Sequence, residues 1–191
     1  MTSPLTRSPA RWCSNTASTM PSLCLELLTE ENLPQAQAVR REDISEDFVD
    51  SADAIWELTQ WGLEHGCLGH TFLILWEGKC VGFLLLGEAI PWETDPPEMA
   101  EEPFYRLMGF VLDNRYRGRG IGGQALDMAI ARCYQDFGPR PIALGVHKDN
   151  IGAQRFYLRH GFVKTRYMEG NDYYFLRYPP RWRSENDRRS G

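Results

Sequence analysis

The chain has 191 residues, a formal net charge of −5 and 42% hydrophobic residues. This length and composition are typical of one packed globular domain, and the negative charge argues against a general nucleic-acid binder, which would normally be basic. No apolar run reaches the roughly 18 residues that a membrane-spanning helix needs, and the N-terminus lacks the apolar region of a secretory signal. We therefore expect a cytoplasmic protein without nucleic-acid or membrane partners.

Hydrophobic patterns predict regular structure between two polar tails. Residues 1–21 predict a disordered N-terminal tail, residues 22–180 a single domain, and residues 181–191 a polar C-terminal tail. Thr29 is placed to cap the first helix, and Gly109 indicates a bulge in its strand. The expected elements are, in chain order, strand 23–28, helix 30–40, helix 50–65, strands 71–76 and 80–86 as a hairpin, strand 104–112, helix 124–134, strand 141–146, helix 150–161, and strands 162–167 and 173–178 as a hairpin. This order predicts an α/β protein with helices packed against a mixed sheet.

The five cysteines, Cys13, Cys24, Cys67, Cys80 and Cys133, are odd in number and have no C-x-x-C spacing. Cys24, Cys80 and Cys133 lie in apolar patterns, where a free thiol behaves as a small hydrophobe. This usage indicates a reducing compartment and argues against a disulfide framework.

A compact H-x-C-x-x-H pattern falls on His65, Cys67 and His70. It is compatible with a metal site, but also with a helix that ends at Gly66 and continues into a turn. Because no second group of ligands is nearby in the sequence, we expect no metal.

The stretch "RYRGRGIGG", residues 115–123, allows three interpretations. It matches the G-x-G-x-x-G of a Rossmann dinucleotide site, with Asp136 near the distance of a ribose contact, but five residues separate Leu112 from the first glycine. A Walker A loop is excluded because Gln124 stands where that motif needs Lys, and flexible Arg-Gly segments occur in low-complexity context. The third interpretation is a pyrophosphate site at a helix N-terminus, with Arg117 and Arg119 as counter-charges.

Two motifs carry a resemblance to a known family. "FVLDNRYRGRGIGGQAL" resembles motif A of the GCN5-related N-acetyltransferases (GNAT), and "NIGAQRFYLRHGF" resembles their motif B. The motif A signature, Arg/Gln-x-x-Gly-x-Gly/Ala, falls on Arg117, Gly120 and Gly122, and motif B falls on Asn150, Ala153, Tyr157, Gly161 and Phe162. The resemblance covers about residues 23–178.

The resemblance implies the GNAT fold, a mixed and mostly antiparallel sheet of about seven strands flanked by four helices. It also implies that acetyl-CoA is the co-substrate, with its pyrophosphate on residues 117–123 and its pantetheine arm beside the end of strand 104–112. The implied cofactor-binding residues are Phe110, Val111, Leu112, Arg117, Gly118, Arg119, Gly120, Ile121, Gly122, Gly123, Asn150 and Tyr157.

The implied reaction is direct attack of an amine on the thioester, with Tyr157 in the position of the family's general acid. The base does not carry over, because Arg106-Leu107-Met108 and Leu144-Gly145-Val146 contain no carboxylate. Glu88, His147, Asp113 and a chain of water molecules remain as candidates.

The acceptor is expected to be a small-molecule amine. The segment 91–103 holds five carboxylates, which would attract a cation, although a solvated acidic loop explains them too. Together with the ending "YYFLRY", which is similar to bacterial polyamine acetyltransferases, this predicts a polyamine-like acceptor. A protein N-terminus, an amino acid, an aminoglycoside, a non-catalytic CoA-binding module and a Rossmann oxidoreductase are the alternatives. Exposed strand edges also offer surfaces for a homodimer.

Overall fold

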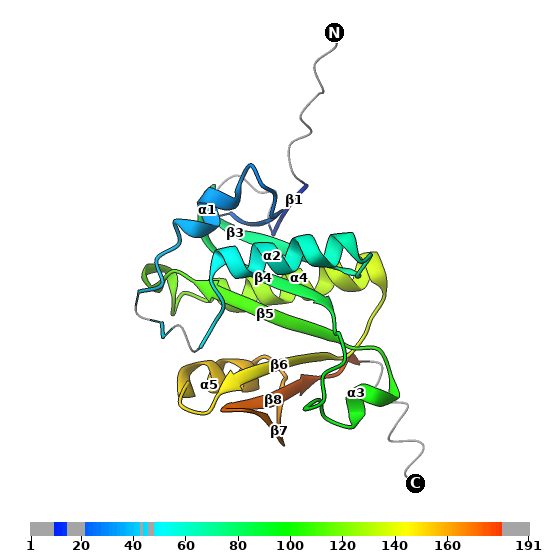
Figure 1. Cartoon of the computed structure of the whole chain (residues 1–191). Coiled ribbons are helices and arrows are strands. Elements are labelled where there is room, and N and C mark those ends of the chain that lie inside the picture. Colours follow the sequence, from blue (N-terminus) through cyan, green and yellow to red (C-terminus); the bar gives the residue numbers. More distant parts are fainter. Residues whose placement is uncertain (1–9, 15–21, 43, 46–47, 181–191) are drawn as a thin grey trace.

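A computed structural model describes residues 10–14, 22–42, 44–45 and 48–180. These residues form one eight-stranded sheet in the order β1-β2-β3-β4-β5-β6-β8-β7 (Figure 1). The strands are β1 Arg11–Cys13, β2 Leu23–Leu27, β3 Gly69–Trp76, β4 Lys79–Glu88, β5 Tyr105–Leu112, β6 Ile142–His147, β7 Val163–Glu169 and β8 Asp172–Arg177. Neighbouring strands are antiparallel except for β5 and β6, which are parallel. The α/β class and the mostly antiparallel sheet are confirmed.

The helices are α1 Leu33–Gln37, α2 Ala52–Glu64, α3 Glu98–Glu101, α4 Ile121–Phe137 and α5 Ile151–Arg159, with a 3-10 turn at Asn114–Tyr116. The described part of the chain thus has one strand and one helix more than expected, namely β1 and α3. The first helix is also shorter than expected, and Thr29 does not cap it. Instead Thr29 donates its backbone N–H to the side chain of Asn32, at 2.7 Å, and the helix starts after Asn32.

Residues 11–13 lie inside the segment that was expected to be a disordered tail. They pair with β2 at the sheet edge, and this register sets Cys13 directly opposite Cys24 with their Cα atoms 4.0 Å apart. The two cysteines form a disulfide, so the prediction that Cys24 is a free thiol was wrong. It failed because the bond depends on a strand of three residues that is too short to show periodicity. Cys67, Cys80 and Cys133 are free, but the cysteines no longer support a reducing compartment, because disulfides persist mainly in oxidising environments.

The sheet lies between two helical layers. On one face, α1 and α2 pack against the central strands, with Ile55 fully buried, and on the other face α4 and α5 cover the sheet through residues such as Leu126 and Tyr157 (Figure 1). The two longest helices, α2 and α4, bury apolar residues on one side, as expected for helices that cover a sheet. Among the described residues, no helix combines the length and apolar character needed to cross a membrane.

Two irregularities of β5 open the sheet. Gly109 has a φ of 58°, and the register between β4 and β5 shifts beside it, which confirms the predicted bulge. A Cβ at this position would lie 2.3 Å from Ile55 Cδ1, so only glycine fits. In addition, β5 pairs with β6 only at Tyr105–Ile142 and Arg106–Ala143. Beyond Arg106 the two parallel strands separate, and the backbone of β5 is left unpaired on that side.

Candidate functional site

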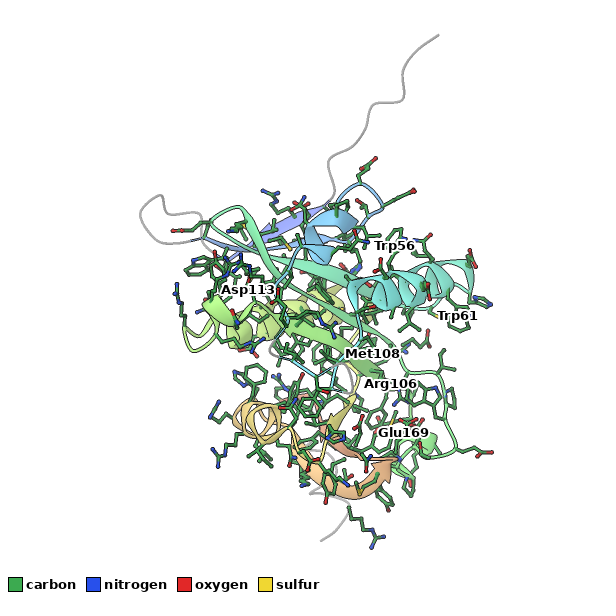
Figure 2. All side chains as sticks on the ribbon, turned by 60° about the vertical axis from the view of Figure 1, so that its left-hand side comes forward. Trp56, Trp61, Arg106, Met108, Asp113 and Glu169 are labelled. Atoms are coloured by element: carbon green, nitrogen blue, oxygen red, sulfur yellow. A yellow bond between two sulfur atoms is a disulfide. The ribbon has the colours of Figure 1, made fainter. Side chains whose placement is uncertain are left out.

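A cavity of about 1300 Å³ follows the opening between β5 and β6. We call one end the glycine end, formed by Arg117, Gly118, Gly120, Gly122 and Gly123, and the other the ionic end, formed by Trp92, Arg106, Glu169, Asp172 and Tyr174. Residues 106 to 112 run between them as an extended strand, so the ends lie on the order of 20 Å apart. Figure 2 shows this separation, with Asp113 beyond the far end of β5 and Arg106 near Glu169.

The glycine end presents backbone rather than side chains. Gly118 and Gly120 have φ angles of 72° and 77°, which turn the chain sharply into α4. No side chain caps this helix, so the N–H groups of its first turn are unpaired within the helix and carry the positive end of its dipole. A Cβ at Gly122 would already touch Leu112, at 3.6 Å from its Cδ2. The loop therefore has the features of an anion site, in which small residues let a ligand approach the backbone.

Most of the predicted cofactor-binding residues line the cavity. They are Phe110, Leu112, Arg117, Gly118, Gly120, Gly122, Gly123, Asn150 and Tyr157. Arg117 also donates from Nε to the carbonyl oxygen of Leu112, at 2.8 Å. Three others lie outside the cavity lining: Val111 and Ile121 are fully buried, because their side chains point into the two cores, and Arg119 lies over the Tyr116 ring, with its Cζ 5.6 Å from the ring centroid.

Helix α5 places Tyr157 in the wall of the cavity. Asn150 starts this helix by accepting the N–H of Ala153 at 3.1 Å, so its capping role is visible in the structure. The Tyr157 ring packs edge-on against Phe156 and Phe162, and its hydroxyl has no hydrogen-bond partner within the described ranges. Burial raises the pKa of this phenol. The hydroxyl therefore stays protonated and is able to donate.

None of the three named base candidates is available at the cavity. Glu88 accepts from Arg140 at 3.2 Å and from the Leu68 N–H at 3.2 Å, which holds it outside the lining. Asp113 is buried and binds Arg115 through two side-chain hydrogen bonds, and the Arg115 guanidinium lowers the pKa of that carboxyl to about 2.

His147 is the third candidate, and it is occupied on two sides. Its Nδ1 accepts the backbone N–H of Asp149 at 3.2 Å, and the Phe48 ring lies 4.9 Å from its own. Its side chain is not part of the cavity lining. Local hydrogen bonds thus explain why the side chains of all three candidates are held away from the cavity. The sequence pattern does not reveal these bonds.

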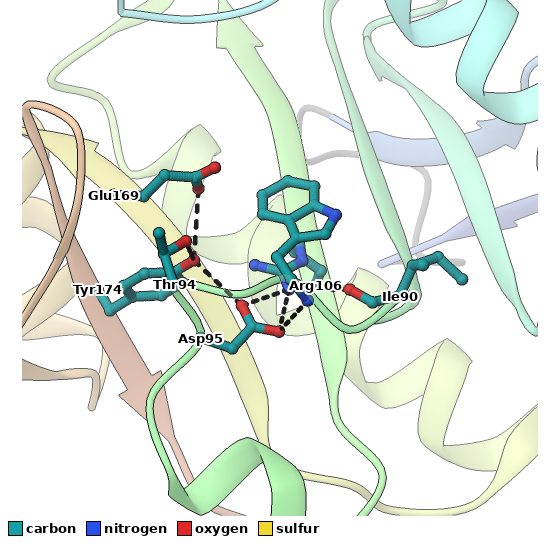
Figure 3. Close-up of polar contacts among 7 residues, drawn as sticks. Ile90, Thr94, Asp95, Arg106, Glu169 and Tyr174 are labelled. Atoms are coloured by element: carbon teal, nitrogen blue, oxygen red, sulfur yellow. Dashed lines mark hydrogen bonds and ion pairs between the residues drawn. The ribbon is translucent and has the colours of Figure 1, made fainter.

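The ionic end contains a network that the sequence reasoning missed (Figure 3). Arg106 on β5 donates through Nη2 to both carboxylate oxygens of Asp95, at 2.8 and 3.0 Å, and its guanidinium lies 3.9 Å from the centroid of the Trp92 ring. Tyr174 on β8 donates to Asp95 at 3.0 Å and lies 3.3 Å from Glu169. The network connects the segment between β4 and β5 with β8. A lone arginine inside an apolar strand was the one signal of it in the sequence.

The carboxylates of the cavity differ from those expected. Of the acidic segment 91–103, Asp95 is neutralised by Arg106, and none of its carboxylates lines the cavity. The lining carboxylates are instead Asp50, Asp127, Glu169 and Asp172. Burial raises the pKa of Asp172, whereas the nearby His147 lowers it. The carboxylates at the end opposite the glycines are Glu169 and Asp172, so the acidic charge there comes from other segments than the loop.

Residues of the H-x-C-x-x-H pattern and of the dinucleotide interpretation have local partners. His70 pairs with Asp136 through Nε2 at 2.7 Å, and His65 stacks on Trp61. Asp136, the ribose contact of the dinucleotide interpretation, also pairs with Arg132 on the same helix. Within the described ranges, no three His, Cys, Asp or Glu side chains are grouped as metal ligands.

The sequence matches a known protein family and curated proteins. The profile of the acetyltransferase (GNAT) family matches residues 31–162. A spermine/spermidine N(1)-acetyltransferase of Bacillus subtilis strain 168 is 30% identical over 89 residues, which are 47% of this chain and 56% of that protein. A probable spermine N(1)-acetyltransferase of Bacillus subtilis subsp. natto is 29% identical over the same length. The chain therefore spans about half the length of the curated relatives it matches.

Solved structures share the fold at low sequence identity. The PaiA N-acetyltransferase of Thermoplasma acidophilum, in complex with coenzyme A, has a TM-score of 0.59 at 17% identity and covers 82% of this chain and 99% of its own. The Salmonella typhimurium acetyltransferase that modifies the N-terminal serine of ribosomal protein L7/L12 has a TM-score of 0.60 at 17% identity, covering 85% and 96%. These similarities support the fold.

Proposed function

The chain belongs to the acetyltransferase (GNAT) family, and we propose that it transfers an acetyl group from acetyl-CoA to a primary amine of a small, cationic, polyamine-like acceptor. The observation that carries this proposal is the polarity of one continuous cavity. Its glycine end offers backbone N–H groups and Arg117 to an anion, and its ionic end offers carboxylates to a cation. A pyrophosphate-bearing donor and an ammonium-bearing acceptor would thus enter from opposite ends.

The described residues fit coenzyme A. The first turn of α4 suits the pyrophosphate, and the unpaired side of β5 beyond Arg106 offers N–H and C=O groups to the amides of a pantetheine arm. The bulge at Gly109 bends this strand where the arm would end. Acetyl-CoA supplies an activated thioester, and the chain would orient it along β5 toward the ionic end.

Tyr157 is the residue we assign to the leaving group. It lines the cavity, its phenol is kept neutral by burial, and its hydroxyl has no competing partner among the described residues. A donor of this kind protonates the thiolate as the thioester C–S bond breaks. A role in packing alone would not require an unpaired hydroxyl at the cavity wall.

The acceptor class follows from the charge of the ionic end. Glu169 and Asp172 line it, and the buried Arg106 is neutralised by Asp95. The names of the Bacillus relatives, a spermine/spermidine and a probable spermine N(1)-acetyltransferase, agree with this charge. A homodimer, a cytoplasmic location and the absence of nucleic-acid and membrane partners stay predictions.

A panel of amines tests the proposal. Purified protein would be mixed with acetyl-CoA and with spermidine, spermine, single amino acids, an aminoglycoside or a peptide with a free N-terminus, and thiol release would be followed. We expect turnover with the polyamines at the lowest KM. Equal or better turnover with the peptide or the amino acids would contradict the polyamine assignment. Coenzyme A binding without thiol release from any amine would identify a non-catalytic module.

A further inference from the structure

We call the opening between β5 and β6, beyond Arg106, the seam. On the face of the sheet that carries the ionic end, one position of β6 beside this seam has no side chain. Leu144 and Val146 of β6 point into the core shared with α4 and α5, so Gly145 faces the opposite side, where Arg106 also lies. Gly145 is exposed and adds no side chain to that face. An acceptor nitrogen approaching a thioester held along β5 would pass over this uncovered stretch of backbone.

One carboxylate borders that stretch. Asp172, the first residue of β8, is paired in register with His147, and its side chain leans back over Gly145. A Cβ placed on Gly145 would lie 3.4 Å from the Cβ of Asp172 and 3.5 Å from its Oδ2. Both residues line the cavity. The absence of a side chain at position 145 therefore leaves the Asp172 carboxylate next to the open seam.

Two other carboxylates of this region have partners, and Asp50 belongs to the segment before α2 rather than to β6 or β8. Asp95 is held by Arg106, and Glu169 lies within hydrogen-bonding distance of the Tyr174 hydroxyl. Asp172 accepts no hydrogen bond from the residues that the structure describes. It is thus the carboxylate next to Gly145, and its oxygens are available to a ligand.

We propose that Asp172 is the general base, which contacts the acceptor amine and takes its proton during acetyl transfer. This rests on the proposed function. The neutral amine nitrogen attacks the thioester carbon, a C–N bond forms and the C–S bond breaks. The nitrogen gives one proton to the Asp172 carboxylate, and the leaving sulfur takes one from Tyr157. Solvent returns a proton from Asp172 to Tyr157, so the products are the N-acetyl amine and free coenzyme A.

The surroundings of Asp172 suit this task. Burial raises its pKa toward the range where a carboxylate accepts a proton more readily, and His147 on β6 opposes this shift. Glu169 on β7 is paired with it in register, and Lys148 follows His147 at the end of β6. Because only the ionised carboxylate accepts a proton, kcat should fall as the pH is lowered through this raised pKa.

The test compares Asp172→Asn with Asp149→Asn in the full chain, using acetyl-CoA and the best amine of the panel. Asp149 is the matched control, since its carboxylate lies 3.8 Å from His147 but is 71% exposed and outside the cavity lining. We expect Asp172→Asn to lower kcat about 100-fold or more and to remove the acidic limb of the kcat–pH profile. Asp172→Glu should recover part of kcat, while coenzyme A affinity and Tm stay as in the unchanged protein.

Two results would overturn the assignment. One is an active Asp172→Asn variant that keeps the kcat and the acidic limb of the unchanged protein. The other is an equal loss of kcat in Asp149→Asn, which would trace the effect to the charge around His147. Absence of thiol release from the unchanged protein would instead refute the proposed function itself, and the base with it.

Discussion

The two ends of the cavity are built in different ways. The glycine end comes from a nearly continuous segment, residues 117–124, and it offers backbone N–H groups. The ionic end is made of side chains from segments far apart in the chain, at positions 92, 106 and 169–174. A backbone site requires small residues at fixed spacing, so it leaves a motif in the sequence. A side-chain site requires only that the fold bring its members together, so it leaves none.

The two ends are also held by different interactions. Asp113 and Arg115, two residues apart, anchor the turn that leads to the glycine end, whereas Arg106 and Asp95 join β5 to the segment before it across a buried contact. The side chains of Arg106 and Asp95 are 4% and 10% exposed. We therefore expect the ionic end to depend more strongly on a single ion pair than the glycine end does.

The largest effect is expected for Arg106→Met. It leaves the Asp95 carboxylate buried without its partner cation, which typically costs about 3–5 kcal/mol of unfolding free energy. Urea unfolding would measure this loss, and the KM for the amine should rise while coenzyme A affinity changes little. Arg132→Met is the control, because its pair with Asp136 lies nearer the surface and should be worth less than about 1 kcal/mol. Similar losses in both variants would mean that the ionic end is not specially dependent on its ion pair.

The next effect concerns Tyr157, which α5 places between the two ends. Tyr157→Phe removes the hydroxyl and keeps the ring packing, so kcat should fall about 100-fold while Tm and coenzyme A affinity are retained. Steady-state kinetics and a coenzyme A titration would separate these quantities. Tyr134→Phe is the control, since that hydroxyl binds the Arg140 carbonyl outside the cavity. An unchanged kcat in Tyr157→Phe would reduce this tyrosine to a packing role.

The smallest effect is expected at Asp113. The pKa of this carboxyl is lowered from 3.8 to about 2 by its bonds with Arg115, so its ionised form stabilises the folded state. That contribution, about 2 kcal/mol, is present above about pH 4 and is lost as the pH falls toward 2. Unfolding free energy measured across this window should drop less steeply for Asp113→Asn than for the unchanged chain. Asp149→Asn, which removes an exposed carboxylate, is the control and should show the same pH dependence of the unfolding free energy as the unchanged chain. If Asp113→Asn also showed that same pH dependence, the expectation would be contradicted.

Much of the fold could be predicted because it rests on local patterns. The hairpin of β3 and β4, the bulge at Gly109 and the helix after the glycines each follow from periodicity or from one residue with special backbone freedom. The edge strand β1 and the disulfide of Cys13 with Cys24 were missed, since three residues in a polar segment carry no period. Here pairing with a neighbouring strand outweighed local propensity.

The sequence by itself determined the glycine end and the position of Tyr157, because a tight turn, an uncapped helix start and a helix cap are formed within a few residues. Only the tertiary structure decided which charges face the cavity. Glu88 and His147 were turned away by contacts with Arg140, Asp149 and Phe48, and Asp172 was brought beside Gly145 by the pairing of β6 with β8. Side-chain charges act through space at short range, so their partners depend on strand order and register.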